Sequence, residues 1–443
     1  MRDSPPQPSS HEWKEGKARC SHFGSCGGCS IQDLPYEAQL ERKRAALQAL
    51  LSPFWSSPLT VHRSPSEWYY RNKMEFAFGR LGHREPPEGK PYTFVLDGTV
   101  LGLKEKGRWD KTLDLQECFL LSPELPALLR SLRGWLAREK LEGYDAKSNR
   151  GFLRHLLVRE AKGTGQRMVM AISAAGEFPK ASFVKAVLDA YPATTVLHGV
   201  STSPSDVART DDVRLLHGPG TIEEEITVQR PLRFRISPFS FFQTNTAGTE
   251  VLYRLIRDFV TTSPSPYPLP VNGERGEGAF AKAPSPRSRG EVGRRPGEGV
   301  ILDLYGGAGG IAFSIADLAS KIISVENNPS ASEDGRHNAA LNGVTNVEFV
   351  TAAVEAFLQA QDLKKTEDAF VILDPARGGI HPKALKAVLT ARPRSVVYVS
   401  CNPKLLAADL KQLSAGYRVA RLEAVDLFPH TEHVEAVARL ELL

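Results

Sequence analysis

Cysteine, methionine and tryptophan are scarce in this sequence, with 5, 4 and 5 copies among 443 residues. No run of about 18 apolar residues occurs, which excludes a membrane-spanning helix. Residues 1–17 are polar and proline-rich and lack the apolar core of a signal peptide, so we expect a cytoplasmic protein with no membrane partner. An odd number of cysteines in such a chain argues against a disulfide framework and for metal binding or catalysis.

The remaining composition is that of an ordinary globular chain. Hydrophobic residues make up 41% and charged residues 24%. At ~100–200 residues per domain, the length is enough for about two to three domains that each bury a core. Lys and Arg total 56 against 51 Asp and Glu, a net charge of +5, which is compatible with a polyanionic partner.

Three of the five cysteines lie within ten residues, as the C-x5-C-x2-C pattern of Cys20, Cys26 and Cys29. Three thiolates leave one position open on a tetrahedral metal or a cubane cluster, and Cys118 is the nearest candidate in the sequence. Structural zinc usually shows two C-x2-C pairs, whereas a 3+1 arrangement favours a [4Fe–4S] cluster. A cluster closed by four cysteines would be structural or redox-sensing. The alternative is a group of unrelated buried thiols.

The first half of the chain has an α+β pattern. An amphipathic stretch within residues 31–60 predicts a helix, and residues 67–118 are β-rich, with WYYRNKMEFAFG and YTFVLDGTVLGL as the clearest strands. Residues 151–175 predict a hairpin, followed by a helix at 178–190 and a strand at 195–200.

Residues 262–299 are rich in Pro, Gly and Ser and contain few large apolar side chains. Such a stretch cannot bury enough surface to offset its ordering entropy, so it predicts a disordered insertion. A basic nucleic-acid tether is the alternative, although acidic residues nearly balance the basic ones.

From Val300 onward, strands alternate with helical sequence. The strands are VILDL, KIISVE, NVEFV, AFVILD and RSVVYVS, and YRVARLEAVDLF and HVEAVARLELL close the chain. The alternation predicts a doubly wound α/β domain, which binds ligands at the carboxyl ends of its strands. Four polar side chains would converge there: Asp303, Glu326, Asp374 and Cys401.

The loop DLYGGAGG lets the backbone approach a ligand, and Glu326 follows at the end of the next strand. A carboxylate there can accept hydrogen bonds from both hydroxyls of a ribose, which leaves S-adenosylmethionine and NAD open. The alternative for Glu326 is a solvated strand end. Cys401 could be a small core residue, but its place before Asn-Pro in a cofactor crevice favours a nucleophile.

With these motifs the chain resembles the RNA uracil-5 methyltransferases, S-adenosylmethionine enzymes that make 5-methyluridine in ribosomal and transfer RNA. The resemblance rests on SPFSFFQTNT, ILDLYGGAGG, SVENNPSA, ILDPARGG, VVYVSCNPKLLAADL and DLFPHTEHVE, together with the N-terminal cysteines. It implies that Cys401 is the nucleophile and Glu435 the base. It also implies a cofactor and base pocket lined by Gln243, Tyr305, Glu326 and Asp374, and a [4Fe–4S] cluster held by Cys20, Cys26, Cys29 and Cys118.

The chain departs from the family pattern in three places. Gly306 stands where the loop usually has cysteine, which should be harmless, and Ala376 replaces the second proline of D-P-P-R. Only 19 residues precede Cys20, so we expect no N-terminal β-barrel RNA-binding module. The resemblance divides the chain into an iron–sulfur segment (1–30), a helix packing on the catalytic domain (31–60), a central α+β RNA-binding domain with Cys118 (61–235), and a Rossmann-like methyltransferase domain (236–443).

The implied substrate is RNA, with large-subunit ribosomal RNA as first candidate and transfer RNA as the alternative, and we expect a monomer. A non-enzymatic iron–sulfur RNA-binding protein is the alternative from another class. Glu432 and His433 are sequence-adjacent rivals of Glu435 for the base. Phe241 or Phe242 could support a flipped base or belong to the core, and WYYRNK and GFLRHLLVR are candidates to grip the RNA backbone.

Overall fold

The structure is a computed structural model that describes residues 18–80, 98–203, 205–210, 212–261, 299–360 and 370–443. The predicted insertion at 262–299 lies outside the described residues as far as residue 298, and so does the first half of YTFVLDGTVLGL. Within the described ranges, no helix is both long enough and apolar enough to cross a membrane.

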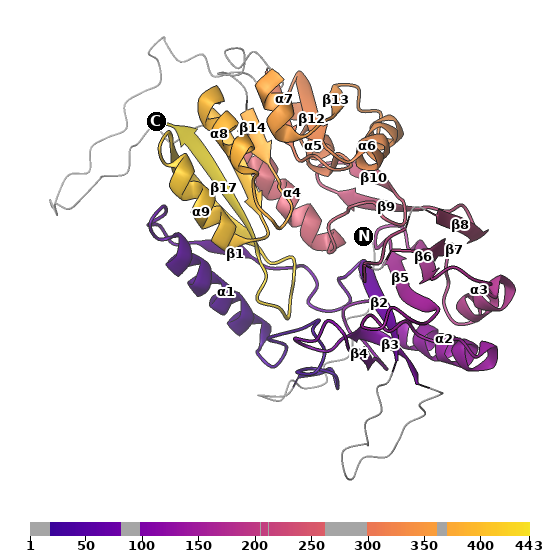
Figure 1. The fold of residues 1–443 in the computed structure, drawn as a ribbon. Coiled ribbons are helices and arrows are strands. Elements are labelled where there is room, and N and C mark those ends of the chain that lie inside the picture. The colour runs from indigo at the N-terminus through magenta and orange to yellow at the C-terminus, as the bar shows by residue number, and fades with distance from the viewer. Residues whose placement is uncertain (1–17, 81–97, 204, 211, 262–298, 361–369) are drawn as a thin grey trace.

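An eight-stranded sheet forms the C-terminal half of the molecule (Figure 1). In spatial order its strands are β1 (Thr60–His62), β16 (Tyr417–Val425), β17 (Glu435–Leu442), β15 (Ser395–Ser400), β14 (Phe370–Leu373), β11 (Val300–Leu304), β12 (Lys321–Glu326) and β13 (Val347–Thr351). Strands β11 to β15 are mutually parallel, and β17 is antiparallel to β15 and β16. The doubly wound α/β domain predicted from Val300 onward is therefore confirmed. Its strand order reverses between β11 and β14, where such sheets bind ligands.

Helices cover both faces of this sheet. One face carries α1 (Tyr36–Leu51), α7 (Val354–Ala360), α8 (Pro382–Ala391) and α9 (Pro403–Leu413). The other carries α4 (Thr246–Thr261), α5 (Gly310–Ser314), the short 3-10 helix η1 (Ala316–Leu318) and α6 (Pro329–Leu341). Leu47 of α1 shares a core with Leu410 of α9, and Figure 1 shows the indigo α1 beside the yellow α9. The beginning of the chain therefore packs on its end.

Strand β1 joins the C-terminal sheet, because Thr60 to His62 pair in parallel with Glu423 to Val425 of β16. The boundary expected at residue 61 falls inside this strand. A buried ion pair supports the same junction: Lys43 Nζ lies 2.7 Å from Asp426 Oδ1, and both side chains are 0% exposed. Lys43 also donates to the carbonyl oxygen of Phe428 at 3.1 Å. These bonds offset the cost of taking two charges out of water.

A seven-stranded sheet forms the other half. In spatial order its strands are β4 (Thr112–Asp114), β3 (Thr99–Lys104), β2 (Lys73–Arg80), β5 (Leu153–Glu160), β6 (Arg167–Ser173), β7 (Thr195–Val200) and β8 (Asp212–His217). Helices α2 (Leu125–Glu139) and α3 (Lys180–Leu188) cover one face, around the buried Trp135. The predicted hairpin is β5–β6, and the helix and strand predicted after it are α3 and β7.

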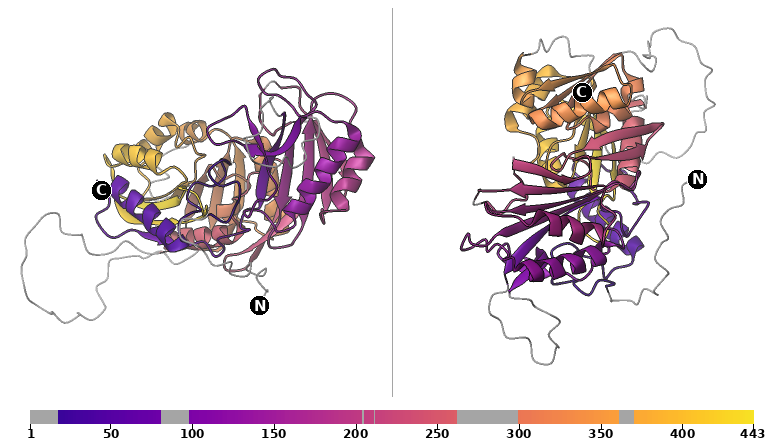
Figure 2. Two further views of the ribbon diagram at one scale, coloured as in Figure 1. Left: turned by 90° about the horizontal axis from the view of Figure 1, so that it is seen from below. Right: turned by 90° about the vertical axis from the view of Figure 1, so that its right-hand side faces the viewer.

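A hairpin of β9 (Ile222–Thr227) and β10 (Pro231–Ile236) lies between the two halves, and the right-hand view of Figure 2 shows it in pink. Its Ile226 and Phe234 share one core with Met170 of β6 and Phe259 of α4. The two sheets therefore share a continuous apolar core, and residues up to 236 also pack on the C-terminal half.

The expectation that GFLRHLLVR grips RNA is wrong for its strand residues, whereas Arg71 and Lys73 of WYYRNK are half-buried, so that part of the expectation stays a prediction. All eight residues of β5 are buried, and Arg154 and Arg159 are only 2% and 3% exposed. Arg154 donates to the carbonyl oxygens of nearby serines, and Arg159 to that of Ser240. These guanidinium groups satisfy loop carbonyls inside the protein, so they do not form a solvated face for phosphates.

Candidate active site

The glycine-rich loop follows β11 at the point where the strand order reverses. Tyr305, Gly307 and Gly309 adopt left-handed backbone, with φ of 65°, 56° and 87°. At Gly309 a Cβ atom would lie only 2.6 Å from the Phe313 ring, so the turn requires glycine. The loop therefore exposes bare backbone, which a ligand can approach closely.

The substitution of glycine for the family's cysteine at position 306 has a structural reason. A Cβ atom at Gly306 would overlap the hydroxyl of Ser324 and lie 2.7 Å from Asp303 Oδ2. Ser324 uses that space to donate to Asp303 Oδ2 at 3.0 Å. Glycine therefore fits this position, because a serine on the neighbouring strand fills the volume.

Glu326 ends β12 beside the glycine-rich loop. Its Oε2 accepts a hydrogen bond from the backbone N–H of Gly307 at 3.1 Å, and its Oε1 accepts from that of Asn328 at 2.7 Å. The side chain is only half-buried. Because each carboxylate oxygen has a second lone pair, Glu326 can still accept hydrogen bonds from two hydroxyl groups.

Sheets of this kind form a ligand crevice where the strand order reverses, here between β11 and β14, and three carboxyl groups that influence one another lie near this point. Burial, followed by the charge of Glu326, raises the pKa of Asp303 to about 7, although Ser324 opposes this. Burial and then Asp303 raise the pKa of Asp374 to about 7. Burial and then Asp374 raise the pKa of Glu435 well above its usual value. Asp303 Oδ1 is buried and has no hydrogen-bond partner among the described residues. Several carboxyl groups therefore lie close together in the crevice, and a cationic ligand there would stabilise their ionised forms.

Cys401 and Glu435 are brought together by the pairing of β15 with β17. The register sets Ser400 opposite Ala436, so the next residues along the two strands are Cys401 and Glu435. Burial, then Glu435 and Asp374, raise the pKa of the half-buried Cys401 thiol to about 11, while Arg377 lowers it. The sulfur therefore lies within electrostatic range of two of the three carboxyl groups.

The two rivals for the base occupy different surroundings. Glu432 forms an ion pair with Arg42 at 2.6 Å, and its side chain is 46% exposed. His433 contacts Arg377, with 3.5 Å between His433 Nε2 and the Arg377 guanidinium, and burial lowers its pKa. Glu435 is 2% exposed and directly influences the thiol. The structure therefore favours Glu435 as the partner of Cys401.

The raised pKa of Cys401 predicts how the thiol reacts. Only the thiolate is alkylated, so a pKa near 11 leaves a fraction of about 10⁻⁴ reactive at pH 7. Alkylation of Cys401 by iodoacetamide should therefore accelerate about tenfold per pH unit between pH 7 and 10, as followed by mass spectrometry of its peptide. Asp374→Asn should lower the pKa and accelerate alkylation at pH 8, whereas Glu432→Gln should not. A rate independent of pH above 8 contradicts the prediction.

Gln243 ends a loop, residues 237–243, that is held from both sides. Ser240 Oγ donates to Asp334 Oδ2 of α6 at 2.5 Å, and Asn72 Nδ2 donates to the carbonyl oxygen of Gln243 at 2.8 Å. Phe242 packs into the core, whereas Phe241 is 63% exposed. A Cβ atom placed on Gly307 would lie 3.9 Å from the Phe241 ring, so this ring lies beside the glycine-rich loop. Phe241 is thus the phenylalanine available to a ligand.

Sequence reasoning missed Tyr253, which lies on the unpredicted helix α4. Its hydroxyl packs against Gly310, and burial followed by Asp374, Asp303 and Glu435 raises its pKa. The apolar spacing of residues 246–261 could have revealed the helix, but nothing local points Tyr253 at the crevice. Tyr305 likewise has a buried hydroxyl without a hydrogen-bond partner among the described residues.

The four cysteines of the first half influence one another. Burial and then Cys118, Cys20 and Cys26 raise the pKa of Cys29 to about 12, and burial is also the main cause that raises Cys118 to about 11. Gly28 donates its N–H to the Cys26 sulfur at 3.3 Å, and Gln32 Nε2 donates to the Cys29 sulfur at 3.6 Å. In the described part of the chain, no group of three or more His, Cys, Asp or Glu side chains is arranged to hold a metal ion.

The cysteine segment is bonded to the loop that leads into β17. Backbone N–H groups of Ser30 and Ile31 donate to the His430 carbonyl oxygen at 2.9 and 3.1 Å. The His430 ring is stacked on Trp68 with centroids 3.8 Å apart, and its backbone N–H donates to Gln39 Oε1 at 2.8 Å. His430 therefore connects the cysteine segment, α1 and the approach to Glu435.

Comparisons with known proteins find similar chains. Residues 294–442 match a family model described as tRNA (uracil-5-)-methyltransferase. An uncharacterised RNA methyltransferase of Clostridium tetani is 33% identical over 436 residues, covering 96% of this chain and 84% of the relative. One from Caldanaerobacter subterraneus subsp. tengcongensis is also 33% identical, with 96% and 85% covered.

A solved structure resembles nearly the whole chain. It is the Pyrococcus abyssi tRNA (uracil-54, C5)-methyltransferase in complex with S-adenosyl-L-homocysteine. The TM-score is 0.69 at 27% sequence identity, and the match covers 94% of this chain and 86% of that one. The similarity therefore extends over both sheets.

Proposed function

This chain belongs to the RNA uracil-5 methyltransferase family of S-adenosylmethionine-dependent enzymes, and on that premise we propose that it methylates uridine C5 through a covalent bond from Cys401 to uracil C6. The observation that carries the proposal is the β15–β17 register, which sets Cys401 beside the buried Glu435 at the crevice edge. We also propose that the protein acts in the cytoplasm as a monomer.

Uracil C5 is a weak nucleophile, so the proposed reaction begins at C6. The Cys401 thiolate adds to C6, and the electron pair of the C5–C6 double bond moves into an enolate that makes C5 nucleophilic. When bound, S-adenosylmethionine would supply a methyl group on a positively charged sulfur; C5 would take that methyl, and S-adenosylhomocysteine would leave as a neutral thioether. Glu435 then removes the C5 proton, the double bond re-forms, and the Cys401 sulfur leaves C6.

The electrostatics of the crevice support both partners of this chemistry. A raised pKa makes Glu435 a stronger base, so it can take a proton from carbon once it is ionised. The orphaned Asp303 oxygen and the neighbouring Asp374 suit the positive charge of the cofactor. The same cation would favour ionisation of Cys401, because it opposes the carboxylates that raise the thiol's pKa.

We assign the cofactor pocket to Gln243, Tyr305, Glu326 and Asp374. Glu326 keeps free lone pairs for the two ribose hydroxyls. Tyr305 opens the glycine-rich loop, and its buried hydroxyl has no hydrogen-bond partner among the described residues. Asp374 faces the crevice from the end of β14, and the Gln243 amide can bond polar groups of the base or cofactor. Phe241 extends from the same loop and can stack on a base that has left its helix.

We also propose that Cys20, Cys26, Cys29 and Cys118 hold a [4Fe–4S] cluster. The other cysteines raise the pKa of the half-buried Cys29 and Cys118, so a bound metal cluster would remove unfavourable repulsion between thiolates. The N–H groups of Gly28 and Gln32 donate to two of these sulfurs, as donors commonly do around cluster ligands. With four cysteine ligands the cluster would be closed, which suits a structural or redox-sensing part.

Protein purified without oxygen should be brown and contain about four iron and four sulfide ions per chain. Cys29→Ser should lose most of the iron, because Cys29 is the thiol whose pKa all three of the other cysteines raise. Cys401→Ser is the matched control and should keep its iron. Colourless protein with one zinc per chain contradicts the cluster.

The substrate we propose first is large-subunit ribosomal RNA, because the four-cysteine set resembles the iron–sulfur members of the family. Transfer RNA is the second candidate, since the Pyrococcus abyssi neighbour is a tRNA methyltransferase. The decisive experiment incubates the protein with labelled S-adenosylmethionine and unmodified ribosomal or transfer RNA transcripts. Digestion to nucleosides should place the label in 5-methyluridine from one of them. Label in another nucleoside contradicts the proposed function.

A further inference from the structure

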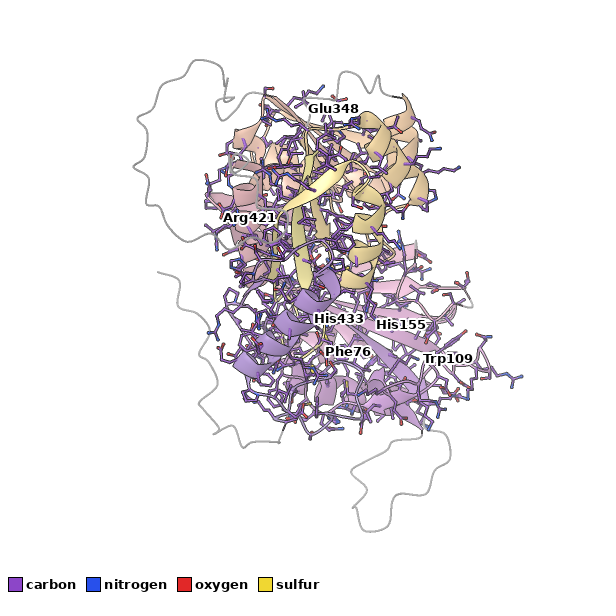
Figure 3. The ribbon with its side chains drawn as sticks, turned by 90° about the vertical axis from the view of Figure 1, so that its left-hand side faces the viewer. Phe76, Trp109, His155, Glu348, Arg421 and His433 are labelled. Carbon is purple, nitrogen blue, oxygen red and sulfur yellow. The ribbon has the colours of Figure 1, made fainter. Side chains whose placement is uncertain are left out.

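Trp109 is 64% exposed, like Phe241 at 63%, but it lies outside the candidate active site. It lies in the turn between β3 and β4, residues 104–112, which we call the tryptophan turn. Figure 3 labels Trp109 at the margin of the half that contains the seven-stranded sheet, and His433 nearer the middle of the molecule. Burying a large indole is favourable, so an indole left in water indicates a surface that contacts a partner.

The tryptophan turn is held in one conformation. The backbone N–H of Glu105 donates to the Lys111 carbonyl oxygen at 2.9 Å. The Arg108 guanidinium donates twice to Asp110, at 2.9 and 2.8 Å, and Lys147 Nζ lies 2.8 Å from Asp110 Oδ2. The indole is therefore presented on a pre-organised turn, which lowers the entropy cost of binding.

Basic side chains are frequent in the tryptophan turn and in residues 147–150, which the ion pair of Lys147 with Asp110 joins to it. They are Lys104, Lys106, Arg108, Lys111, Lys147 and Arg150, against the acidic Glu105, Asp110 and Asp206. Lys106 and Arg150 are exposed and have no ion-pair partner in the part of the chain that the structure describes. An exposed aromatic ring with surplus positive charge matches an unpaired base with its flanking phosphates.

The tryptophan turn is also fixed to the segment that reaches the active site. The N–H of Lys106 donates to the Ser25 carbonyl oxygen at 2.8 Å, and the N–H of Gly27 to that of Lys104 at 3.3 Å. A few residues later, Ser30 bonds to His430 on the approach to Glu435. One short segment therefore sets the position of the tryptophan turn relative to the reacting base.

We propose that Trp109 stacks on an unpaired base of the substrate RNA, while Lys106 and Arg150 contact the neighbouring phosphates. The inference rests on the proposed function, because RNA is the polyanion that this family binds. It also supplies a contact surface in place of the buried arginines of β5. An acidic protein partner is the competing occupant, and the experiment below separates the two.

The test measures binding of a short fluorescein-labelled single-stranded RNA by anisotropy. Trp109→Ala should weaken binding about tenfold, because stacking on an aromatic ring is sequence-tolerant but strong. Trp109→Phe should recover most of the affinity, since phenylalanine also stacks. Leu215→Ala, which removes a 55% exposed side chain on β8, is the matched control and should bind as wild type. The Lys106→Ala/Arg150→Ala double variant should reduce the salt dependence of binding.

A second readout is the fluorescence of the indole itself. Subtracting the emission of Trp109→Phe from that of the wild type isolates Trp109, and this signal should be quenched by the RNA. With ribosomal or transfer RNA transcripts, Trp109→Ala should raise KM more than it lowers kcat. Equal RNA affinity of Trp109→Ala and wild type, in a protein that methylates uridine, overturns this inference alone and favours a protein partner. A wild type that methylates no uridine overturns the proposed function instead.

Discussion

Cys401→Ala is expected to lower methyl transfer to uridine by at least about 10⁴-fold, because the variant cannot form the bond to C6 that makes C5 nucleophilic. The sulfur lies at the end of β15, next to Glu435 across the ladder, and no other cysteine ends a strand of the eight-stranded sheet within the described residues. The measurement is single-turnover transfer of label from S-adenosylmethionine to the RNA transcript that the wild type methylates.

Two controls separate lost chemistry from lost folding. The variant should bind S-adenosylhomocysteine like the wild type, as shown by an equal shift in melting temperature, because only one half-buried sulfur is removed. With 5-fluorouridine in the RNA, the wild type should form an adduct stable in a denaturing gel, since fluorine at C5 cannot leave as a proton. Cys401→Ala should form none. Methylation that persists in this variant would falsify the nucleophile assignment.

Glu435→Gln is expected to accumulate a covalent RNA–protein adduct on ordinary RNA. Addition of the thiolate and methyl transfer do not require the base, but the C5 proton must leave before the sulfur can. An amide cannot accept that proton, so turnover should fall by about 10²–10⁴-fold while the adduct builds up. The measurement is a denaturing gel of labelled RNA after a single mixing with enzyme and cofactor.

The matched control is Glu432→Gln, the same change three residues away at a 46% exposed side chain. It should turn over normally and leave no adduct. If adduct accumulates in Glu432→Gln and not in Glu435→Gln, the base is the other carboxylate. The burial of Glu435 and its influence on the thiol argue for the first outcome.

Sequence alone determined the features that depend on local pattern. Strands alternating with helices from Val300 gave the doubly wound sheet, since burial on both faces makes each strand a short apolar run. The strand ends then placed Asp303, Glu326, Asp374 and Cys401 at one edge, because parallel strands share their carboxyl ends. The C-x5-C-x2-C spacing likewise identified a group of thiols, and the structure places these within one another's electrostatic influence.

Tertiary structure decided what depends on contacts between distant parts of the chain. The structure shows that β1 belongs to the C-terminal sheet and that Arg154 and Arg159 are buried. It also shows that Phe241 is exposed while Phe242 packs in the core, and that Tyr253 contacts the glycine-rich loop. None of these follows from periodicity, because an alternating pattern says which residues share a face but not what covers it. The pairing of Cys401 with Glu435 is of the same kind. Each of the two residues can be identified from its own motif. Whether they lie next to each other depends on the strand register, which only the folded sheet fixes.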